Sequence, residues 1–228
     1  MCGRNSLFVP QDDLERRFDA SIVAGGGYTP RYNVSPGDGL EVITAEAPEE
    51  IDRYRWGVVP PWANEPEEGL VNARAETAPE KQLFRDAWAS HPCLVLSSGF
   101  YEWRQCDHGP NRPFRIYRNG DPLFAMAGLW DVWEHDGERT RCVTVLTTDA
   151  TDPVASIHDR MPVVLPADAE REWLHGDPAT RAALCRPYPD DDLAVYEVST
   201  RVNDPVNDDP AVVEPLDGDG DVGEFASG

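Results

Sequence analysis

Cys2 has the strongest potential for covalent chemistry in this chain, because it follows the initiator methionine. Its small side chain favours removal of Met1, which leaves an α-amine beside the thiol. Such a pair traps an aldehyde in two steps: the amine forms an imine, and the sulfur then closes a five-membered thiazolidine on the imine carbon. At pH 7 about 10–20 % of an α-amine is unprotonated, several hundredfold more than of a Lys amine, and the thiol is more nucleophilic than a hydroxyl. The alternative is that Cys2 is only the second residue of a buried first strand.

Two titratable residues farther along the chain have the potential to move protons. Glu102 lies among aromatic residues in Phe100-Tyr101-Glu102-Trp103, where desolvation would raise its pKa and make it a proton donor or acceptor. His158 follows an expected short helix and titrates near neutrality. Taken alone, Glu102 also fits an outward-facing position on a strand, and His158 also fits a capping or core role.

Two further stretches carry residues that suit binding. Asn72 and Arg74 alternate with alanines, so both polar side chains share one face if the segment is extended; they also suit hydrogen bonds to neighbouring backbone. The segment from Trp56 to Trp62 reads WGVVPPW. Two tryptophans beside prolines suit either core packing or stacking against splayed bases.

The composition limits the partners of the chain. Its 228 residues carry a formal net charge of −22, and 19 of the 20 basic residues are Arg. A surface so acidic and so poor in Lys suggests adaptation to high salt, where carboxylates keep a protein hydrated and salt screens their repulsion. Intrinsic disorder is excluded because 40 % of the residues are hydrophobic and occur in strand-like and helix-like blocks. The charge argues against generic nucleic-acid binding, so a contact with DNA requires a local cluster of Arg.

The cysteines and the apolar segments indicate a soluble intracellular protein. The five cysteines are odd in number and lack close paired spacing, which favours neither disulfides nor zinc, and we predict no metal and no cofactor. No run of 18 apolar residues and no signal peptide occurs. We therefore predict a cytoplasmic protein without membrane contact.

The hydrophobic pattern predicts more strands than helices. An acidic pair at 12–13 opens a short helix, and Thr77, Pro79 and Glu80 form the signature of a capping box for another. Further helices are expected at 153–157, 167–175 and 178–184. Strands are expected at 40–45, 53–59, 93–97, 113–118, 123–133, 141–147, 163–165 and 194–198.

The order of these elements predicts the fold class. Strand and helix do not alternate as a parallel sheet requires, and no linker divides the chain. We predict one α+β domain over residues 2–216, a predominantly antiparallel, barrel-like sheet with several short flanking helices. Residues 217–228 are acidic and rich in Gly, so we predict a disordered tail there.

Together these stretches resemble the SRAP family, the SOS-response-associated peptidase or abasic-site-processing proteins. The resemblance runs in order through MCGR, RYNVSPG, WGVVPPWA, NARAET, GFYEW, HDRMPVVL and VSTRVND, over about residues 2–216. It implies binding to single-stranded DNA, or to a junction of single and double strands, and a covalent crosslink to abasic sites in the DNA damage response. A location at the nucleoid and a monomeric state are further expectations.

The resemblance also implies a role for each residue of the site. Cys2 would be the nucleophile, Asn72 would position it, Glu102 would act on its amine, and His158 would assist opening of the deoxyribose ring. The residues expected to contact DNA are Arg4, Asn33, Pro36, Trp62, Arg74 and Arg160. The strongly acidic charge departs from the basic DNA-facing surface that is usual in the family. Stacking and covalent capture are therefore expected to hold the DNA in place of long-range attraction.

Two other functions are compatible with the same residues. An N-terminal-nucleophile thiol peptidase could use Cys2, Glu102 and His158 for acyl transfer, with removal of Met1 as its minimal reaction. A non-catalytic module could bind single-stranded nucleic acid through Trp and Arg alone. A Cys2→Ala variant separates the three functions, because only the crosslinker then loses a heat-stable adduct with abasic DNA.

Overall fold

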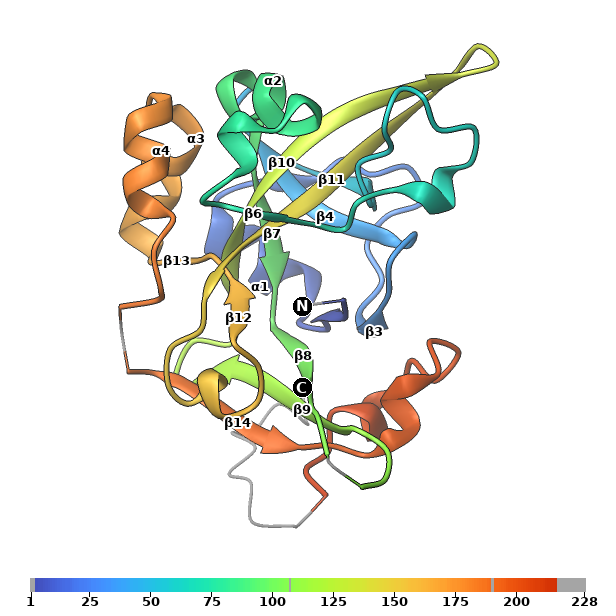
Figure 1. The fold of residues 1–228 in the computed structure, drawn as a ribbon, viewed down its shortest axis with the longest axis vertical. Helices are drawn as coiled ribbons and strands as arrows, with labels where there is room; N and C mark the ends of the chain where they lie inside the picture. The colour runs from blue at the N-terminus through green and yellow to red at the C-terminus, as the bar shows by residue number, and fades with distance from the viewer. Residues whose placement is uncertain (1–2, 107, 190, 217–228) are drawn as a thin grey trace.

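The computed structural model describes residues 3–106, 108–189 and 191–216. Its centre is a closed ring of five strands (Figure 1): β11 (Glu138–Asp149), β10 (Phe124–His135), β7 (Pro92–Ser97), β4 (Gly39–Thr44) and β5 (Glu50–Trp56). These strands pair antiparallel except where β5 meets β11 in parallel and closes the ring. The prediction of an α+β fold with a barrel-like, mainly antiparallel sheet is confirmed.

Short strands extend this barrel at its edges. β2 (Ser21–Ile22) pairs with β5, β13 (Val164–Leu165) with β10, and both β6 (Asn72–Arg74) and β12 (Arg160–Pro162) with β11. Because β6 and β12 both pair with β11, two segments far apart in sequence meet on one strand.

A second sheet carries the start of the chain. Its strand order is β14 (Leu193–Glu197), β9 (Arg112–Arg118), β8 (Gly99–Arg104), β1 (Asn5–Leu7) and β3 (Arg31–Val34). β8 follows β7 almost directly: Gly99, whose φ is +157°, is the first residue after the bend, and an added Cβ there would lie 2.8 Å from the Ile116 carbonyl oxygen. This close approach requires glycine and leads the chain from one sheet into the other.

Helices cover the outside of the barrel. They are α1 (Gln11–Phe18), α2 (Gln82–Ser90), α3 (Glu170–His175) and α4 (Pro178–Leu184), with 3₁₀ turns η1 (Pro66–Glu68), η2 (Ala78–Glu80), η3 (Val154–Ser156), η4 (Ala167–Ala169), η5 (Thr200–Asn203) and η6 (Pro210–Val212). In Figure 1, α3 and α4 lie on one side of the barrel and α2 lies above it. No helix of the described ranges is long and apolar enough to cross a membrane.

At two predicted elements the backbone shows why the boundary differs from the prediction. The Thr77 side chain caps no helix; its carbonyl instead closes the η2 turn, and α2 starts only at Gln82. The strand expected over 53–59 ends at Trp56, because Gly57 takes a φ of +127°, which favours glycine. The tail predicted at 217–228 lies outside the described residues.

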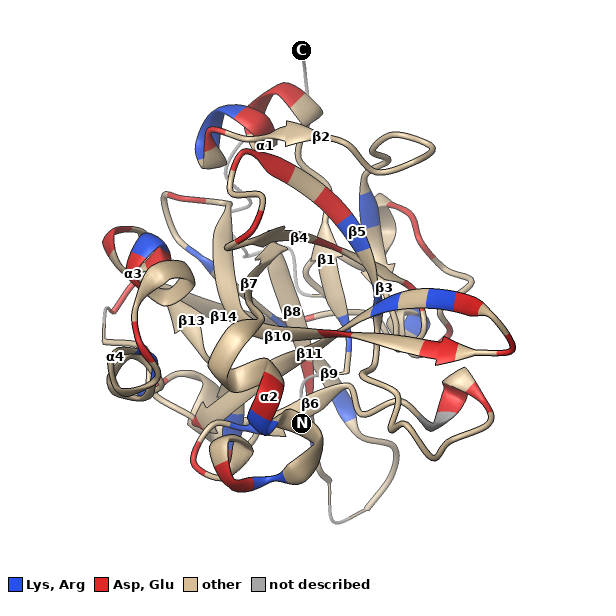
Figure 2. Ribbon diagram, turned by 90° about the horizontal axis from the view of Figure 1, so that it is seen from above, with Lys and Arg blue, Asp and Glu red and all other residues tan. Residues whose placement is uncertain are grey.

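The core fills both the barrel and the space under the helices. Phe84, Ala87 and Trp88 of α2 are buried, as their helical spacing predicts, and Trp88 packs edge to face on Trp173 of α3. Cys93 and Cys142 are buried in the same way as small apolar residues. Charged residues of both signs lie on the outer elements α1 and β5, as Figure 2 shows. A smaller set of charged residues is buried: Glu41, Glu102, Arg115, Arg160, Glu170 and Arg181.

Candidate functional site

The described chain starts alongside β8. The backbone N–H of Tyr101 donates to the carbonyl of Arg4 at 3.0 Å, and Asn5 pairs with Phe100. Continuing this antiparallel register places Gly3 opposite Glu102. Cys2 lies outside the described residues, but it is bonded directly to Gly3.

Glu102 is a buried carboxyl on β8. Only 2 % of the residue is exposed, so the outward-facing alternative is wrong. The pKa of Glu102 is raised to about 7, mainly because the carboxyl is buried and to a smaller extent because of the charge of Asp159. A carboxyl with this pKa exists in both protonation states near neutral pH, which suits a group that both accepts and donates a proton.

His158 is half-buried, and a hydrogen bond from the backbone determines which of its ring nitrogens carries the proton. The N–H of Arg160 donates to Nδ1 of His158 at 2.9 Å, which leaves the proton of a neutral ring on Nε2. Asp159 Oδ1 also lies 3.0 Å from Nδ1, a contact that favours the protonated ring. The Asp159 side chain is 87 % exposed and its attraction is screened, whereas burial lowers the pKa of His158, so we assign the neutral ring.

The segments that carry Glu102 and His158 lie against each other. Arg104, at the end of β8, donates from Nε to the carbonyl of Ser156 in η3 at 3.2 Å. The effect of Asp159 on the pKa of Glu102 places the following turn near the same carboxyl. The structure therefore brings into contact the segments of Glu102 and His158, two residues that are 56 positions apart in the sequence.

Asn72 and Arg74 lie on β6, beside β11. Val145 is in register with Asn72, and Thr147 with Arg74. Ala73 between them is buried, Asn72 is half-buried and Arg74 is exposed. The predicted alternation is confirmed, and it turns both polar side chains away from the core.

Arg160 reaches the same part of β11 from the opposite side. Its Nη2 donates to the carbonyl of Thr147 at 2.7 Å, and its two Nη atoms also donate to both carboxylate oxygens of Glu76 at 2.7 and 2.8 Å. A bond to Asp149 at 2.6 Å completes the cluster. The pKa of Glu76 is lowered by its hydrogen bonds with Arg160.

Glu76 is a site residue that the sequence reasoning missed. Its spacing was a usable signal, because Glu76 continues the alternation of Asn72 and Arg74 on the same face. The bidentate pair fixes the Arg160 guanidinium close to His158, so Glu76 contributes to the site without being one of its proton-transfer groups.

Arg4 and Asn33 form a second cluster, at the other edge of β1. Arg4 donates from Nη1 to Oδ1 of Asn33 at 2.6 Å and to the Val202 carbonyl, and its guanidinium lies 5.8 Å from the centre of the Trp103 ring. Asn33 is fully buried, and its amide also binds the carbonyl of Asn207 at 2.7 Å. In this structure both residues organise the loop after β14 from within; a contact of either with DNA stays a prediction.

The remaining predicted DNA contacts lie on exposed loops. Pro36 follows β3 and is exposed, and Trp62 is 67 % exposed beyond the end of β5. The core-packing interpretation holds for Trp56, which is 1 % exposed, but is wrong for Trp62. Trp62 therefore presents its aromatic ring to solvent, and a contact of this ring with DNA stays a prediction.

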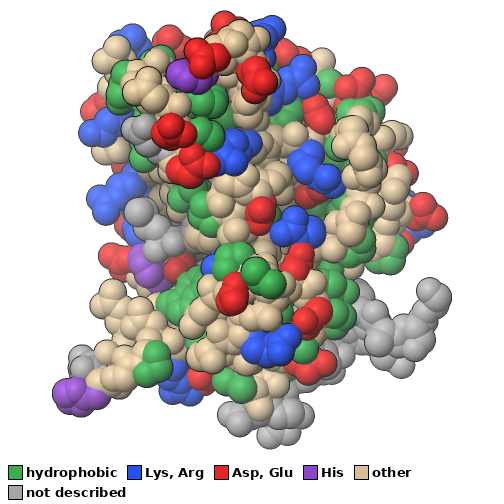
Figure 3. All heavy atoms as spheres, turned by 90° about the vertical axis from the view of Figure 1, so that its right-hand side faces the viewer, with side chains coloured by type: hydrophobic (Ala, Val, Ile, Leu, Met, Phe, Trp, Pro, Cys, Tyr) green, Lys and Arg blue, Asp and Glu red, His purple; other side chains and the backbone are tan. Residues whose placement is uncertain are grey.

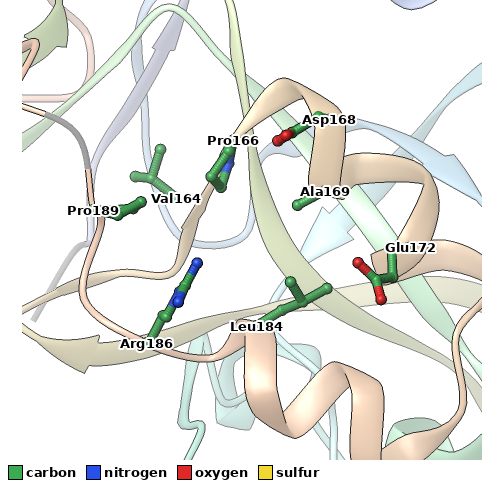
Figure 4. Close-up of a pocket in the computed structure, with 8 residues that line it drawn as sticks. All are labelled: Val164, Pro166, Asp168, Ala169, Glu172, Leu184, Arg186 and Pro189. Atoms are coloured by element: carbon green, nitrogen blue, oxygen red, sulfur yellow. The ribbon is translucent and has the colours of Figure 1, made fainter.

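A hollow beside β13 and α3 lies away from these residues. It encloses about 180 Å³, and Figure 4 shows its lining. None of the predicted site residues contributes to it; the lining residues are Val164, Pro166, Asp168, Ala169, Glu172, Leu184, Arg186 and Pro189. In the described part of the chain, no group of three or more His, Cys, Asp or Glu is placed to hold a metal ion.

Comparison with known proteins was made for the whole chain. Residues 1–205 match the family model described as SOS response associated peptidase (SRAP). The chain is 38 % identical to the abasic site processing protein YoqW of Bacillus subtilis, over 94 % of this chain and 99 % of that protein. It is 30 % identical to the abasic site processing protein YedK of Escherichia coli, over 95 % and 100 %.

A vertebrate relative and a solved structure extend the comparison. The abasic site processing protein HMCES of Xenopus tropicalis is 32 % identical, over 92 % of this chain and 77 % of that protein. A crystal structure of a protein from Bacteroides thetaiotaomicron superimposes with a TM-score of 0.83 at 26 % identity, over 94 % of this chain and 99 % of that one.

Proposed function

The chain belongs to the SRAP family, and on that premise we propose that it captures abasic sites in single-stranded DNA as a covalent thiazolidine on Cys2. The observation that carries the proposal is the register of the chain start. Arg4 pairs with Tyr101, so the residue bonded to Cys2 lies opposite Glu102, whose raised pKa suits proton transfer. An amine and a thiol placed beside such a carboxyl provide the two nucleophiles and the proton-transfer group that capture of an aldehyde requires.

The reaction balances with one water released. The α-amine of Cys2 adds to the aldehyde carbon of the opened sugar, and loss of water gives the imine. The thiol then adds to the imine carbon and its proton passes to the nitrogen, which closes the thiazolidine. No oxidant, metal or cofactor is required, and the product no longer has the aldehyde that drives strand scission by β-elimination.

Glu102 serves the steps at the amine. Its ionised form accepts a proton from the α-ammonium group, and its protonated form delivers a proton to the departing water. One carboxyl performs both steps because its pKa lies at about 7.

His158 serves the opening of the sugar. An abasic deoxyribose is mostly a closed hemiacetal, so a donor at the ring oxygen is needed to expose the aldehyde. The neutral imidazole carries its proton on Nε2, because Nδ1 accepts from the Arg160 backbone. Asn72, on β6, positions Cys2 in this scheme.

The DNA is held by stacking more than by charge. Trp62 offers an exposed aromatic face, and Arg74 is an exposed cation on β6. On the side of the molecule in Figure 3, acidic and basic side chains are interspersed. At the net charge of −22, local contacts rather than a basic field provide the affinity. Such binding is compatible with high salt.

The intact mass of the protein after incubation with an oligonucleotide that carries one abasic site tests the proposal. We expect a protein without Met1 and a heat-stable adduct that Cys2→Ala abolishes. Retention of Met1, or an adduct in Cys2→Ala, would overturn it.

A thiol peptidase is the second candidate, because the family description names that activity. It uses the same nucleophile, and it predicts peptide cleavage that Cys2→Ala abolishes while wild-type protein forms no DNA adduct.

A further inference from the structure

Val206 is the most exposed large apolar side chain in the described part of the protein. It is 88 % exposed, against 67 % for Trp62 and 48 % for Val23. Exposure of this degree on a mobile loop would have no significance. The loop that carries Val206 is, however, held in place by several hydrogen bonds.

The loop is held by the buried Asn33. The Asn33 amide donates to the carbonyls of Asp204 and Asn207 at 3.2 and 2.7 Å, the residues on either side of the tip. The Val206 N–H donates to Oδ1 of Asp204 at 3.1 Å. Asp208 closes the base of the loop by accepting the backbone N–H groups of Tyr32 and Asn33. A tip held in this way loses little conformational entropy when a ligand covers it.

The same loop is bonded to the candidate site. Arg4 donates to the Val202 carbonyl, and the Trp103 indole donates to Oδ1 of Asn203 at 2.8 Å. Trp103 follows Glu102 directly, and Arg4 lies two residues after Cys2. In Figure 1 this segment, coloured red, lies at the lower right, below β3. The loop that carries Val206 is therefore hydrogen-bonded to both segments of the candidate site, the start of the described chain and the strand of Glu102.

The charges around the tip do not form a basic patch that would attract DNA phosphates. Asp208 is paired with Arg31, and Asp209 with Arg201 at 2.9 Å, so these two cations are already neutralised. A contact that does not depend on charge keeps its strength when salt screens phosphates, and burial of an apolar side chain is such a contact.

From these observations we infer that Val206 packs against a base or sugar face of the DNA strand bound at the site. It is a determinant of affinity that does not depend on salt. The inference rests on the proposed function, and it adds a contact surface that includes none of the proton-transfer groups.

Binding of a fluorescent single-stranded oligonucleotide without an abasic site, followed by anisotropy over a salt series, tests the inference. We expect Val206→Asn to weaken binding about three- to tenfold at every salt concentration, with an unchanged salt slope. Val206→Lys should steepen the slope of log K against log salt by about 0.7, the value for one added phosphate contact on a single strand. Val23→Asn and Val23→Lys, next to the edge strand β2, are the matched controls.

The outcomes separate the inference from the proposed function. If the wild type forms the adduct but the Val206 variants bind DNA like the Val23 variants, only the inference is overturned. Absence of a wild-type adduct overturns the proposed function, while the anisotropy series still reports on the Val206 surface. Absence of any binding to the unmodified oligonucleotide overturns the inference, and the adduct then decides the proposed function.

Discussion

The backbone N–H of Arg160 donates a hydrogen bond to Nδ1 of His158 at 2.9 Å, and the side chain of the same Arg160 is clamped by Glu76. One residue thus links an ion pair to the tautomer of the imidazole. We expect the position of the proton on His158 to respond to contacts made two strands away, because β6 and β12 flank β11.

Substitution of Glu76 by Gln should change the tautomer of His158 indirectly, through Arg160. Loss of the carboxylate leaves the buried Arg160 with Asp149 and one carbonyl, at a cost of about 1 kcal/mol because the Glu76 side chain is 48 % exposed. Urea denaturation checks the stability, and ¹⁵N spectra of the imidazole report the tautomer. Glu80→Gln, exposed in η2, is the control. Unchanged spectra in Glu76→Gln would show that the backbone alone fixes the ring.

The pKa of Glu102 predicts how capture depends on pH. Its ionised form accepts the ammonium proton, so the observed rate constant should rise as the pH passes through about 7. Glu102→Gln should slow capture on the order of 10²-fold and remove this rise. Single-turnover rates between pH 5 and 9 provide the measurement. A rise of equal size in Glu102→Gln would assign it to another group, such as the amine.

The same shift has a consequence for stability. A carboxyl whose pKa is raised by folding contributes its stabilising effect below the unfolded pKa, near 4.5, and the effect is lost as the pH rises towards 7. The free energy of unfolding of the wild type should therefore fall more across this window than that of Glu102→Gln. Denaturant titrations at pH 4.5 and 7.5 measure the difference. Parallel changes in both proteins would contradict the raised pKa.

His158→Ala should slow capture because ring opening loses its proton donor. General acid catalysis accounts for about 10²–10⁴-fold, and binding of the unmodified strand should be unchanged. An oligonucleotide that carries a linear aldehyde separates the steps, since it needs no ring opening and should restore most of the rate. An equal loss on both substrates would instead place His158 in imine or thiazolidine formation.

Much of this architecture could be predicted from the sequence, because periodicity reports burial. The alternation of Asn72 and Arg74 predicted one polar face for an extended segment, and the aromatic neighbours of Glu102 suggested desolvation, although an outward-facing position was also compatible with the sequence. The partners of buried polar groups could not be predicted in this way. The pairing of Arg160 with Glu76 and of Asn33 with the loop after β14 depends on which strands become neighbours, and no local pattern encodes that.

Trp62 also shows where the sequence stops being sufficient. Trp56 and Trp62 stand in one motif, yet Trp56 is buried and Trp62 is exposed, because Gly57 redirects the chain between them. The exposure of each tryptophan depends on the direction of the backbone after Gly57. The proline-rich sequence indicated an extended, non-helical segment there but not its direction.

Substitution of Cys2 by Ser tests whether sulfur makes capture permanent. The amine of Cys2→Ser can still form an imine, but a hydroxyl adds to the imine carbon less readily than a thiol, and the resulting ring opens again. The adduct of Cys2→Ser should therefore form slowly and disappear on heating. Reduction with borohydride before heating should preserve it. Wild-type adduct should survive heating without reduction, and its yield should fall little between 0.1 and about 1 M salt, where the screening length is about 3 Å. Denaturing gels with and without borohydride, over that salt range, measure both properties. Heat-stable adduct from unreduced Cys2→Ser would exclude the thiazolidine, and a steep loss of wild-type yield with salt would show that phosphate attraction holds the DNA after all.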